Sequence, residues 1–313
     1  MRTRPTVRRA LRVALVVAAA SALLLGALAA WLVRDPSAGF AARRGTLASV
    51  TLEDHAEVAG HVEEHYVLRS TSGLRVEVAV KRPVGSAPPG GRPAALLLGG
   101  LETGRKALRF VPDTRGAVAV ALSYPYDGPK KPKGLAVIPA APAVRAALRD
   151  TPPAIQLALD WLLAQPDVDP RRVELVGVSL GAPFACIAGA LDARFARVWA
   201  VHGGGDGASL IEAGLARRIR FAPARWLVAR AAWIAAGGPP LAPERWVAGI
   251  APREFVQVAA RGDERIPQAS VEVLFAAASE PKELLWTEGG HVDTDKERVA
   301  RELVDLVLER MAR

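Results

Sequence analysis

Residues 177 to 181 read Gly-Val-Ser-Leu-Gly, the pattern in this sequence with the clearest chemical meaning. It matches G-x-S-x-G, in which a sharp turn between a strand and a helix exposes the serine oxygen. Gly177 and Gly181 fit this interpretation because the turn brings neighbouring chain too close for a bulky side chain. Ser179 is therefore a candidate nucleophile for acyl transfer, and the alternative is a structural serine in an ordinary glycine-rich turn.

The segments on either side of this motif favour the chemical interpretation. Residues 172–176, Arg-Val-Glu-Leu-Val, are typical of a strand, and residues 182–188 can form a helix. Pro183 is tolerated there because a proline fits the first turn of a helix. The backbone N–H of Leu180, directly after the serine, would face the oxyanion that forms on a substrate carbonyl. We expect Leu180 to supply one of the two donors that such an oxyanion needs.

Strand-like and helical stretches alternate along residues 47–313, which predicts a mostly parallel central sheet flanked by helices. The runs His61–Ser70 and Leu74–Arg82 alternate in polarity around Ser72-Gly73 and indicate an antiparallel hairpin at the start of the sheet. Six later runs are expected to complete it: Ala94–Leu98, Ala117–Leu122, Val173–Val176, Val198–Val201, Glu254–Ala260 and Glu283–Trp286.

Helices are expected between and after these strands. Thr151–Ala164 carries an apolar stripe, with Thr151 as its N-cap, and Thr294–Met311 closes the chain with a similar amphipathic pattern. The connection Asp206–Ala251 is too long for a simple loop and is helical in composition. We interpret it as a lid whose tryptophans form its core, although they could instead line an acyl pocket or touch a bilayer: Trp226, Trp233 and Trp246.

The N-terminal segment is predicted to be a transmembrane helix. Residues 13–33 have no charged side chain and, at about 1.5 Å per residue, can cross the ~30 Å core of a bilayer. The arginines before them favour a cytoplasmic N-terminus, which places the domain outside the cytoplasmic membrane on a single-pass anchor. We therefore divide the chain into an anchor at 1–34, a linker at 35–46 and a domain at 47–313. The alternative is a signal peptide cleaved near Ala27-Leu28-Ala29, which would make the domain a secreted one.

The charge of the chain is concentrated in this N-terminal segment. The whole sequence carries +9, but residues 1–34 hold six arginines and no acidic residue, so the remainder carries only +3. Such a balance gives no electrostatic reason to expect a nucleic-acid partner. The single cysteine, Cys186, permits no internal disulfide.

Residues 167–173, Asp-Val-Asp-Pro-Arg-Arg-Val, run through a strand into the serine motif. Together these segments resemble the dienelactone-hydrolase and acetyl-esterase-like branch of the α/β-hydrolase family, and the similarity spans residues 60–313. The resemblance implies an α/β-hydrolase fold. It also implies that an acid and a histidine follow the serine in the chain, each on the loop after a late strand.

Both of these residues have counterparts here. Asp263 lies in Arg-Gly-Asp-Glu-Arg-Ile-Pro, which looks like the family's Gly-Asp-x-x-Val-Pro element, and His291 ends Glu-Gly-Gly-His, which matches its Gly-His element. The resemblance implies that His291 is the base and that Asp263 holds its tautomer. Asp263 could instead be a turn former, with Glu264 or Asp206 as the acid. His202 also follows a strand, but it precedes Asp263 in the chain.

The second oxyanion donor is implied by the same resemblance. Gly99-Gly100-Leu101 follows the run Leu96–Leu98 and stands where the family has His-Gly-x, so the expected donor is the N–H of Leu101, alongside Leu180. The glycine at position 99 departs from the family pattern. It removes a side chain that often braces this loop.

Two other patterns have simpler interpretations. His61-Val62-Glu63-Glu64-His65 fits an inverted zinc-protease motif, but that motif needs a helix. In a strand the two histidines lie about 13 Å apart, too far to share one zinc. The basic run Lys130–Lys133 could meet an anionic group, but such a run is typical of a solvated loop. We expect no metal and no organic cofactor.

The sequence thus predicts a serine hydrolase that cleaves a carboxylic ester through an acyl-serine intermediate. Its partners would be a small-molecule or lipid ester and, through the N-terminal segment, a membrane. A peptidase, a thioesterase or an acyl-lipid hydrolase could use the same residues, because fold and triad do not determine the substrate. A catalytically silent binding or scaffold protein is the alternative from another class.

Overall fold

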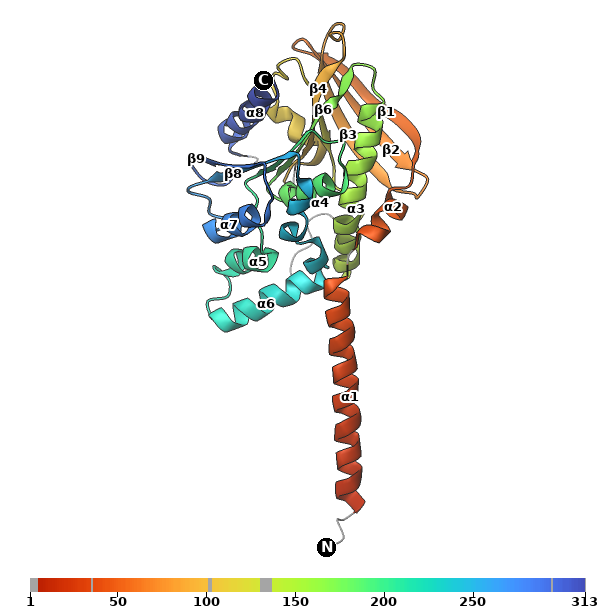
Figure 1. The fold of residues 1–313 in the computed structure, drawn as a ribbon, viewed down its shortest axis with the longest axis vertical. Coiled ribbons are helices and arrows are strands. Elements are labelled where there is room, and N and C mark those ends of the chain that lie inside the picture. Colours follow the sequence, from red (N-terminus) through yellow and green to blue (C-terminus); the bar gives the residue numbers. More distant parts are fainter. Residues whose placement is uncertain (1–4, 35, 101–102, 130–136, 294, 313) are drawn as a thin grey trace. The chain divides into compact units, whose positions relative to one another are not determined.

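The computed structural model of the protein describes residues 5–34, 36–100, 103–129, 137–293 and 295–312 (Figure 1). The chain forms two compact units, Met1–Pro36 and Ser37–Arg313. In the first unit, helix α1 (Pro5–Val33) contains a segment long and apolar enough to cross a membrane, Arg9–Leu28. The expected N-terminal apolar helix is therefore present. A signal sequence passes the same test of length and composition.

In the described part of the second unit, nine strands form one sheet in the order β1-β2-β3-β5-β4-β6-β7-β8-β9. The pairs β1–β2, β2–β3 and β3–β5 are antiparallel. The pairs β5–β4, β4–β6, β6–β7, β7–β8 and β8–β9 are parallel. The strands are β1 (Leu47–Val58), β2 (His61–Ser70), β3 (Arg75–Pro83), β4 (Arg92–Leu98), β5 (Val118–Leu122), β6 (Val168–Val178), β7 (Arg197–Val201), β8 (Glu254–Ala260) and β9 (Lys282–Thr287).

Helices cover both faces of this sheet, as Figure 1 shows. One face packs against α3 (Val137–Leu163) and α4 (Gly181–Leu191). The other packs against the 3₁₀ helix η1 (Gly104–Phe110) and α8 (Glu297–Met311). The expected mostly parallel sheet flanked by helices is confirmed, and so is the antiparallel hairpin formed by β2 and β3.

The alternation of side chains along each strand creates a separate core on each face. On β5, Val118, Val120 and Leu122 belong to the core beneath α3 and α4. Ala119 and Ala121 belong to the core beneath η1 and α8. The first core is thus lined by larger side chains of this strand than the second.

The lid segment between β7 and β8 is helical, as expected. It contains α5 (Gly207–Leu215), α6 (Ala222–Ala235) and three 3₁₀ helices: η3 (Pro239–Leu241), η4 (Pro243–Arg245) and η5 (Val247–Ile250). The helix α7 (Gln268–Ala277) follows β8. The tryptophans do not form one lid core: Trp226 is half exposed beneath the Arg230 guanidinium, whereas Trp246 packs against Phe40.

Two local expectations differ from the structure. Residues 35–46 are not only a linker, because Ser37–Arg44 forms helix α2 and buries Phe40 in the main core. Thr151 does not cap a helix. It lies inside α3, where its Oγ1 donates a hydrogen bond to the Ala147 carbonyl four residues earlier, a pattern of helix interiors. Thr294 and residues 130–133 lie outside the described residues.

Candidate active site

The serine motif forms a strained turn between β6 and α4. Ser179 has a φ of +55°, in the left-handed region that is costly for a side chain other than glycine. Its N–H donates to the Val201 carbonyl of the neighbouring strand, 2.8 Å away, which helps to hold this conformation. A Cβ on Gly181 would lie 2.0 Å from the Leu98 carbonyl oxygen, and one on Gly177 would lie 2.4 Å from the Gly181 oxygen. Both glycines are therefore required by the close approach of backbone.

Three side chains that are distant in sequence form one chain of hydrogen bonds above this turn. The Oγ of Ser179 lies 2.8 Å from Nε2 of His291, and Nδ1 of His291 lies 2.8 Å from Oδ2 of Asp263. They follow β6, β9 and β8, whose carboxyl ends meet at one edge of the parallel sheet. The structure thus brings together the three residues that the sequence predicts. The arrangement can take a proton from Ser179 while Asp263 orients the imidazole.

The loop after β8 fixes the carboxylate of Asp263. Its second oxygen, Oδ1, accepts the backbone N–H groups of Arg265 and Ile266, each at 2.8 Å. Burial raises the pKa of Asp263, but the hydrogen bonds from His291 and from these two amides outweigh it and bring the pKa below its usual value. The group is therefore ionised at neutral pH and accepts the Nδ1 proton of His291.

The alternative acids do not contact the imidazole of His291. Glu264 accepts the backbone N–H of His291 at 2.8 Å and pairs with Lys296 at 3.0 Å. Hydrogen bonds from the backbone N–H groups of His291 and of Glu264 itself, together with Lys296, lower the pKa of Glu264 to about 2. Asp206 caps helix α5 through the N–H of Ser209. Of these acids, Asp263 is the one hydrogen-bonded to the ring.

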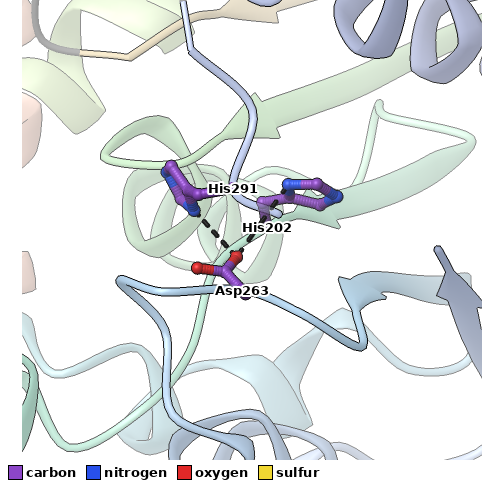
Figure 2. Close-up of side chains that lie close together, drawn as sticks. All are labelled: His202, Asp263 and His291. Atoms are coloured by element: carbon purple, nitrogen blue, oxygen red, sulfur yellow. Dashed lines mark hydrogen bonds and ion pairs between the residues drawn. The ribbon is translucent and has the colours of Figure 1, made fainter. Parts of the chain in front are cut away.

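A second histidine, His202, lies beside this chain, and sequence reasoning did not assign it a role. Figure 2 shows His202 and His291 on either side of Asp263. The Nδ1 of His202 accepts the N–H of Val292 at 3.0 Å and lies 4.0 Å from Oδ2 of Asp263. Burial lowers the pKa of His202 to about 4 despite the neighbouring carboxylate. His202 is therefore neutral and contributes no charge at neutral pH. Its position at the end of β7 was the only sequence signal.

The same three side chains of Figure 2 could in principle hold a metal ion, because one potential ligand atom from each lies within 4.8 Å of the others. Nδ1 of His291 and Oδ2 of Asp263 already share a hydrogen bond with each other. Nδ1 of His202 uses its lone pair to accept the Val292 N–H. The donor set thus suits a hydrogen-bonded network better than a cation.

Other side chains brace the glycine loop that follows β4. Tyr124 donates its hydroxyl hydrogen bond to the Gly99 carbonyl at 2.8 Å, and Thr103 donates to the Gly100 carbonyl at 2.9 Å. A Cβ on Gly99 would lie 2.1 Å from Oγ1 of Thr103, so this threonine occupies the space that a side chain at position 99 would need. Leu101 lies outside the described residues.

The loop passes close to the nucleophile. A Cβ on Gly100 would lie 3.8 Å from that of Ser179. Leu180, directly before α4, stands at the positive end of a helix. Backbone groups of both segments therefore border the position of a substrate carbonyl at Ser179.

A cavity of about 380 Å³ opens beside Ser179 on the η1 and α8 side of the sheet. Its volume lies within the range of small-molecule pockets. The lining is predominantly aliphatic. Among the described residues, four polar side chains contribute to it: Thr103, Ser179, Arg265 and Asp293.

No protein-family model and no curated protein matches this sequence. Solved structures do: an acetyl xylan esterase from Paenibacillus sp. R4 is 16% identical, with a TM-score of 0.64 over 88% of this chain and 94% of that one. Acetyl xylan esterase 1 from Thermoanaerobacterium sp. JW/SL YS485 is 14% identical, with a TM-score of 0.62 over 88% and 94%. An alpha/beta hydrolase from Penicillium sp. sh18 is 18% identical, with a TM-score of 0.53 over 80% and 99%.

At these identities the similarity shows the fold alone. Residues 37–313 have the α/β-hydrolase fold.

Proposed function

We propose that the protein is a serine hydrolase that cleaves a carboxylic ester, with Ser179 as nucleophile, His291 as base and Asp263 as orienting acid. The observation that carries this proposal is the continuous hydrogen-bonded chain from Ser179 through His291 to Asp263. The strained turn that exposes Ser179 supports it. The esterases of the same fold, similar to this chain in structure, are consistent with it.

The reaction has two steps in this proposal. In the first, Oγ of Ser179 attacks the ester carbonyl while its proton moves to Nε2 of His291. The resulting tetrahedral oxyanion collapses to an acyl-serine, and the leaving alkoxide takes the proton from His291 and departs as an alcohol. In the second, His291 deprotonates a water molecule that attacks the acyl-serine. The tetrahedral intermediate then expels Oγ of Ser179, which takes the proton back from His291, and the carboxylic acid is released.

The N–H of Leu180 is the first proposed donor to the oxyanion, and the N–H of Leu101 is the second. The hydrogen bond from Tyr124 to the Gly99 carbonyl supports this assignment because it holds the described start of this loop beside Ser179. A peptide or thioester carbonyl could occupy the same position. We favour an oxygen ester because the esterases of similar fold act on one.

We also propose that α1 is retained as a single-pass anchor with the hydrolase domain outside the cytoplasmic membrane. The arginines before the apolar segment support this orientation by the positive-inside rule. Protease added to sealed vesicles of known orientation should then digest the domain only from the extracytoplasmic side. Digestion from the other side would contradict the orientation, and an N-terminus found beyond Ala29 would show cleavage.

The test of the catalytic assignment is labelling with a small fluorophosphonate, which phosphonylates an activated serine and releases fluoride. The full chain in detergent should be labelled, and Ser179→Ala should not. Asp263→Asn should slow labelling strongly, on the order of the 10⁴-fold loss expected when a triad acid can no longer hold the correct tautomer.

Glu264→Gln is the matched control because it changes the neighbouring carboxylate, which contacts the backbone of His291 and not its ring. We expect it to label at nearly the parent rate. A folded parent chain that is not labelled would support the silent binding protein instead. Loss of labelling in Glu264→Gln but not in Asp263→Asn would contradict the assigned acid.

A further inference from the structure

The cavity beside Ser179 has a polar mouth and an apolar interior. The polar side chains in the described part of its lining are all at least partly exposed: Thr103, Ser179, Arg265 and Asp293. The last two form an ion pair with each other. The interior is lined by side chains such as Ala95, Ala119, Val111 and Val176, each at most 2% exposed. A space of this kind suits a ligand with one polar end at Ser179 and an extended hydrocarbon part.

Small side chains line the cavity where it borders β4 and β5. Ala95 and Ala119 are paired neighbours on these strands and point toward the cavity. On the other face their neighbours in sequence are Ala94 and three larger side chains, Leu96, Val118 and Val120, which belong to the core beneath α3 and α4. Ala107 of η1 and Ala300 of α8 continue the small lining from the opposite side. The space is therefore encoded by the side-chain pattern of several elements.

The depth of the cavity follows from the strand register. Gly99 lies beside the nucleophile turn, since Leu98 pairs with Gly177. Ala95 lies four residues earlier on β4, which corresponds to about 13 Å along a strand. The cavity thus extends roughly this far below the level of Ser179. Its volume of about 380 Å³ holds about a dozen groups of ~30 Å³, the volume of one water molecule.

We propose that this cavity binds the acyl chain of the substrate, and that the substrate is an ester of an unbranched fatty acid of about eight to twelve carbons. The inference rests on the proposed function. The cavity is lined by Gly99, Gly100 and Leu180, which border the position of the substrate carbonyl, whereas His291 does not line it. Because the leaving alcohol must receive its proton from His291, the alcohol belongs on the other side of Ser179 and the acyl group in the cavity.

The experiment measures kcat/KM of the full chain, in lipid nanodiscs, for two series of esters. One series varies the acyl chain from acetate to dodecanoate with p-nitrophenol as the constant leaving group. The other keeps acetate and lengthens the alcohol. We expect kcat/KM to rise by up to about fourfold for each methylene of the acyl chain. From butanoate to decanoate the total should be on the order of a hundredfold or more. The alcohol series should show no comparable rise.

Two variants fill the cavity at its deep end, Ala119→Leu and Ala95→Leu. Each leucine takes the room of about three methylene groups and should shorten the preferred acyl chain by about that length. Turnover of the acetate ester and labelling by a small fluorophosphonate should fall much less than turnover of the decanoate ester, because neither small group reaches the deep end of the cavity. Ala276→Leu, at an exposed position of α7 outside the cavity, is the matched control and should keep the parent chain-length profile.

The outcomes separate this inference from the proposed function. Absence of labelling and of acetate turnover in the folded parent would contradict the function itself. Labelling and acetate turnover with no rise along the acyl series would overturn the acyl pocket alone. A rise along the alcohol series, lost in Ala119→Leu, would assign the cavity to the leaving group and also overturn it. Melting temperatures of the variants distinguish a filled cavity from a damaged fold.

Discussion

Acid is expected to destabilise the hydrolase domain through His202. Its pKa is lowered from 6.5 to about 4, mainly by burial, and the nearby ring of His291 opposes protonation further. The carboxylate of Asp263, with Oδ2 4.0 Å away, favours protonation but does not offset burial. Between pH 6.5 and 4 the unfolded chain binds a proton that the folded chain does not. The free energy of unfolding therefore falls as the pH drops through this window. From pH 7 to pH 5, His202 alone should remove roughly 2 kcal/mol.

The test compares the parent with His202→Asn by urea unfolding at pH 7, 6 and 5, followed by tryptophan fluorescence. Asparagine suits this position because it tolerates the φ of +48° and its side-chain oxygen can accept the Val292 N–H. It cannot titrate. The difference between the two pH profiles therefore reports the contribution of His202. Identical slopes for parent and variant would refute the conclusion that His202 is buried in its neutral form.

Three further predictions concern parts of the structure that support the site. Tyr124→Phe removes the hydrogen bond to the Gly99 carbonyl. We expect kcat to fall at nearly unchanged KM, and to fall by less than the roughly hundredfold effect of losing an oxyanion donor. An equal fall in kcat and KM would contradict the role of the brace. Phe40→Ala empties a buried position of the main core and should lower the free energy of unfolding, measured in urea, by about 3 to 5 kcal/mol. A decrease under about 1 kcal/mol would mean that α2 contributes little to stability. Gly181→Ala places a Cβ 2.0 Å from the Leu98 oxygen and should abolish fluorophosphonate labelling. Labelling at the parent rate would contradict the need for glycine at this position.

The sequence predicted the centre of the fold well because the parallel strands are nearly continuous apolar runs. Strands such as Val198–Val201 are buried on both faces, so each run is short, aliphatic and bounded by turns. The hairpin of β2 and β3 was predictable from its alternation. The turn at Ser179 was predictable because the glycine requirement around it is local in sequence.

The elements that were missed lack an unambiguous local signal. Strand β1 alternates in polarity through Val50, Leu52 and Val58, but it is exposed along nearly its whole length, so no buried face marks it as part of the sheet. Helix α2 is short, and Phe40 is its one large apolar side chain, which packs against Trp246. The length of α3 was underestimated because Pro152 and Pro153 resemble the first turn of a helix. In each case a tertiary contact decides the structure.

The same distinction applies to the site. Ser179, Asp263 and His291 each follow a strand end with a recognisable motif, so they could be proposed from sequence. Tyr124 contacts Gly99, 25 residues away in the chain. His202 contacts Thr287 and Val292, which are 85 and 90 residues away. No residue pattern around them indicates those contacts, because the packing of β5, β7 and β9 creates them.

The two faces of the sheet meet different demands at Ser179. The strained turn has to be held in place, and the face beneath α3 and α4 does this with leucine and valine packed below it. A substrate has to approach the serine from a space that stays empty in the free protein, and the alanines of the opposite face leave that space. Because strand side chains alternate, a single β4–β5 pair can serve both demands. It follows that larger side chains at Ala95 or Ala119, on the cavity side, should change substrate choice with little loss of stability. Smaller side chains at Leu96 or Val120, beneath α3 and α4, should instead unfold the turn.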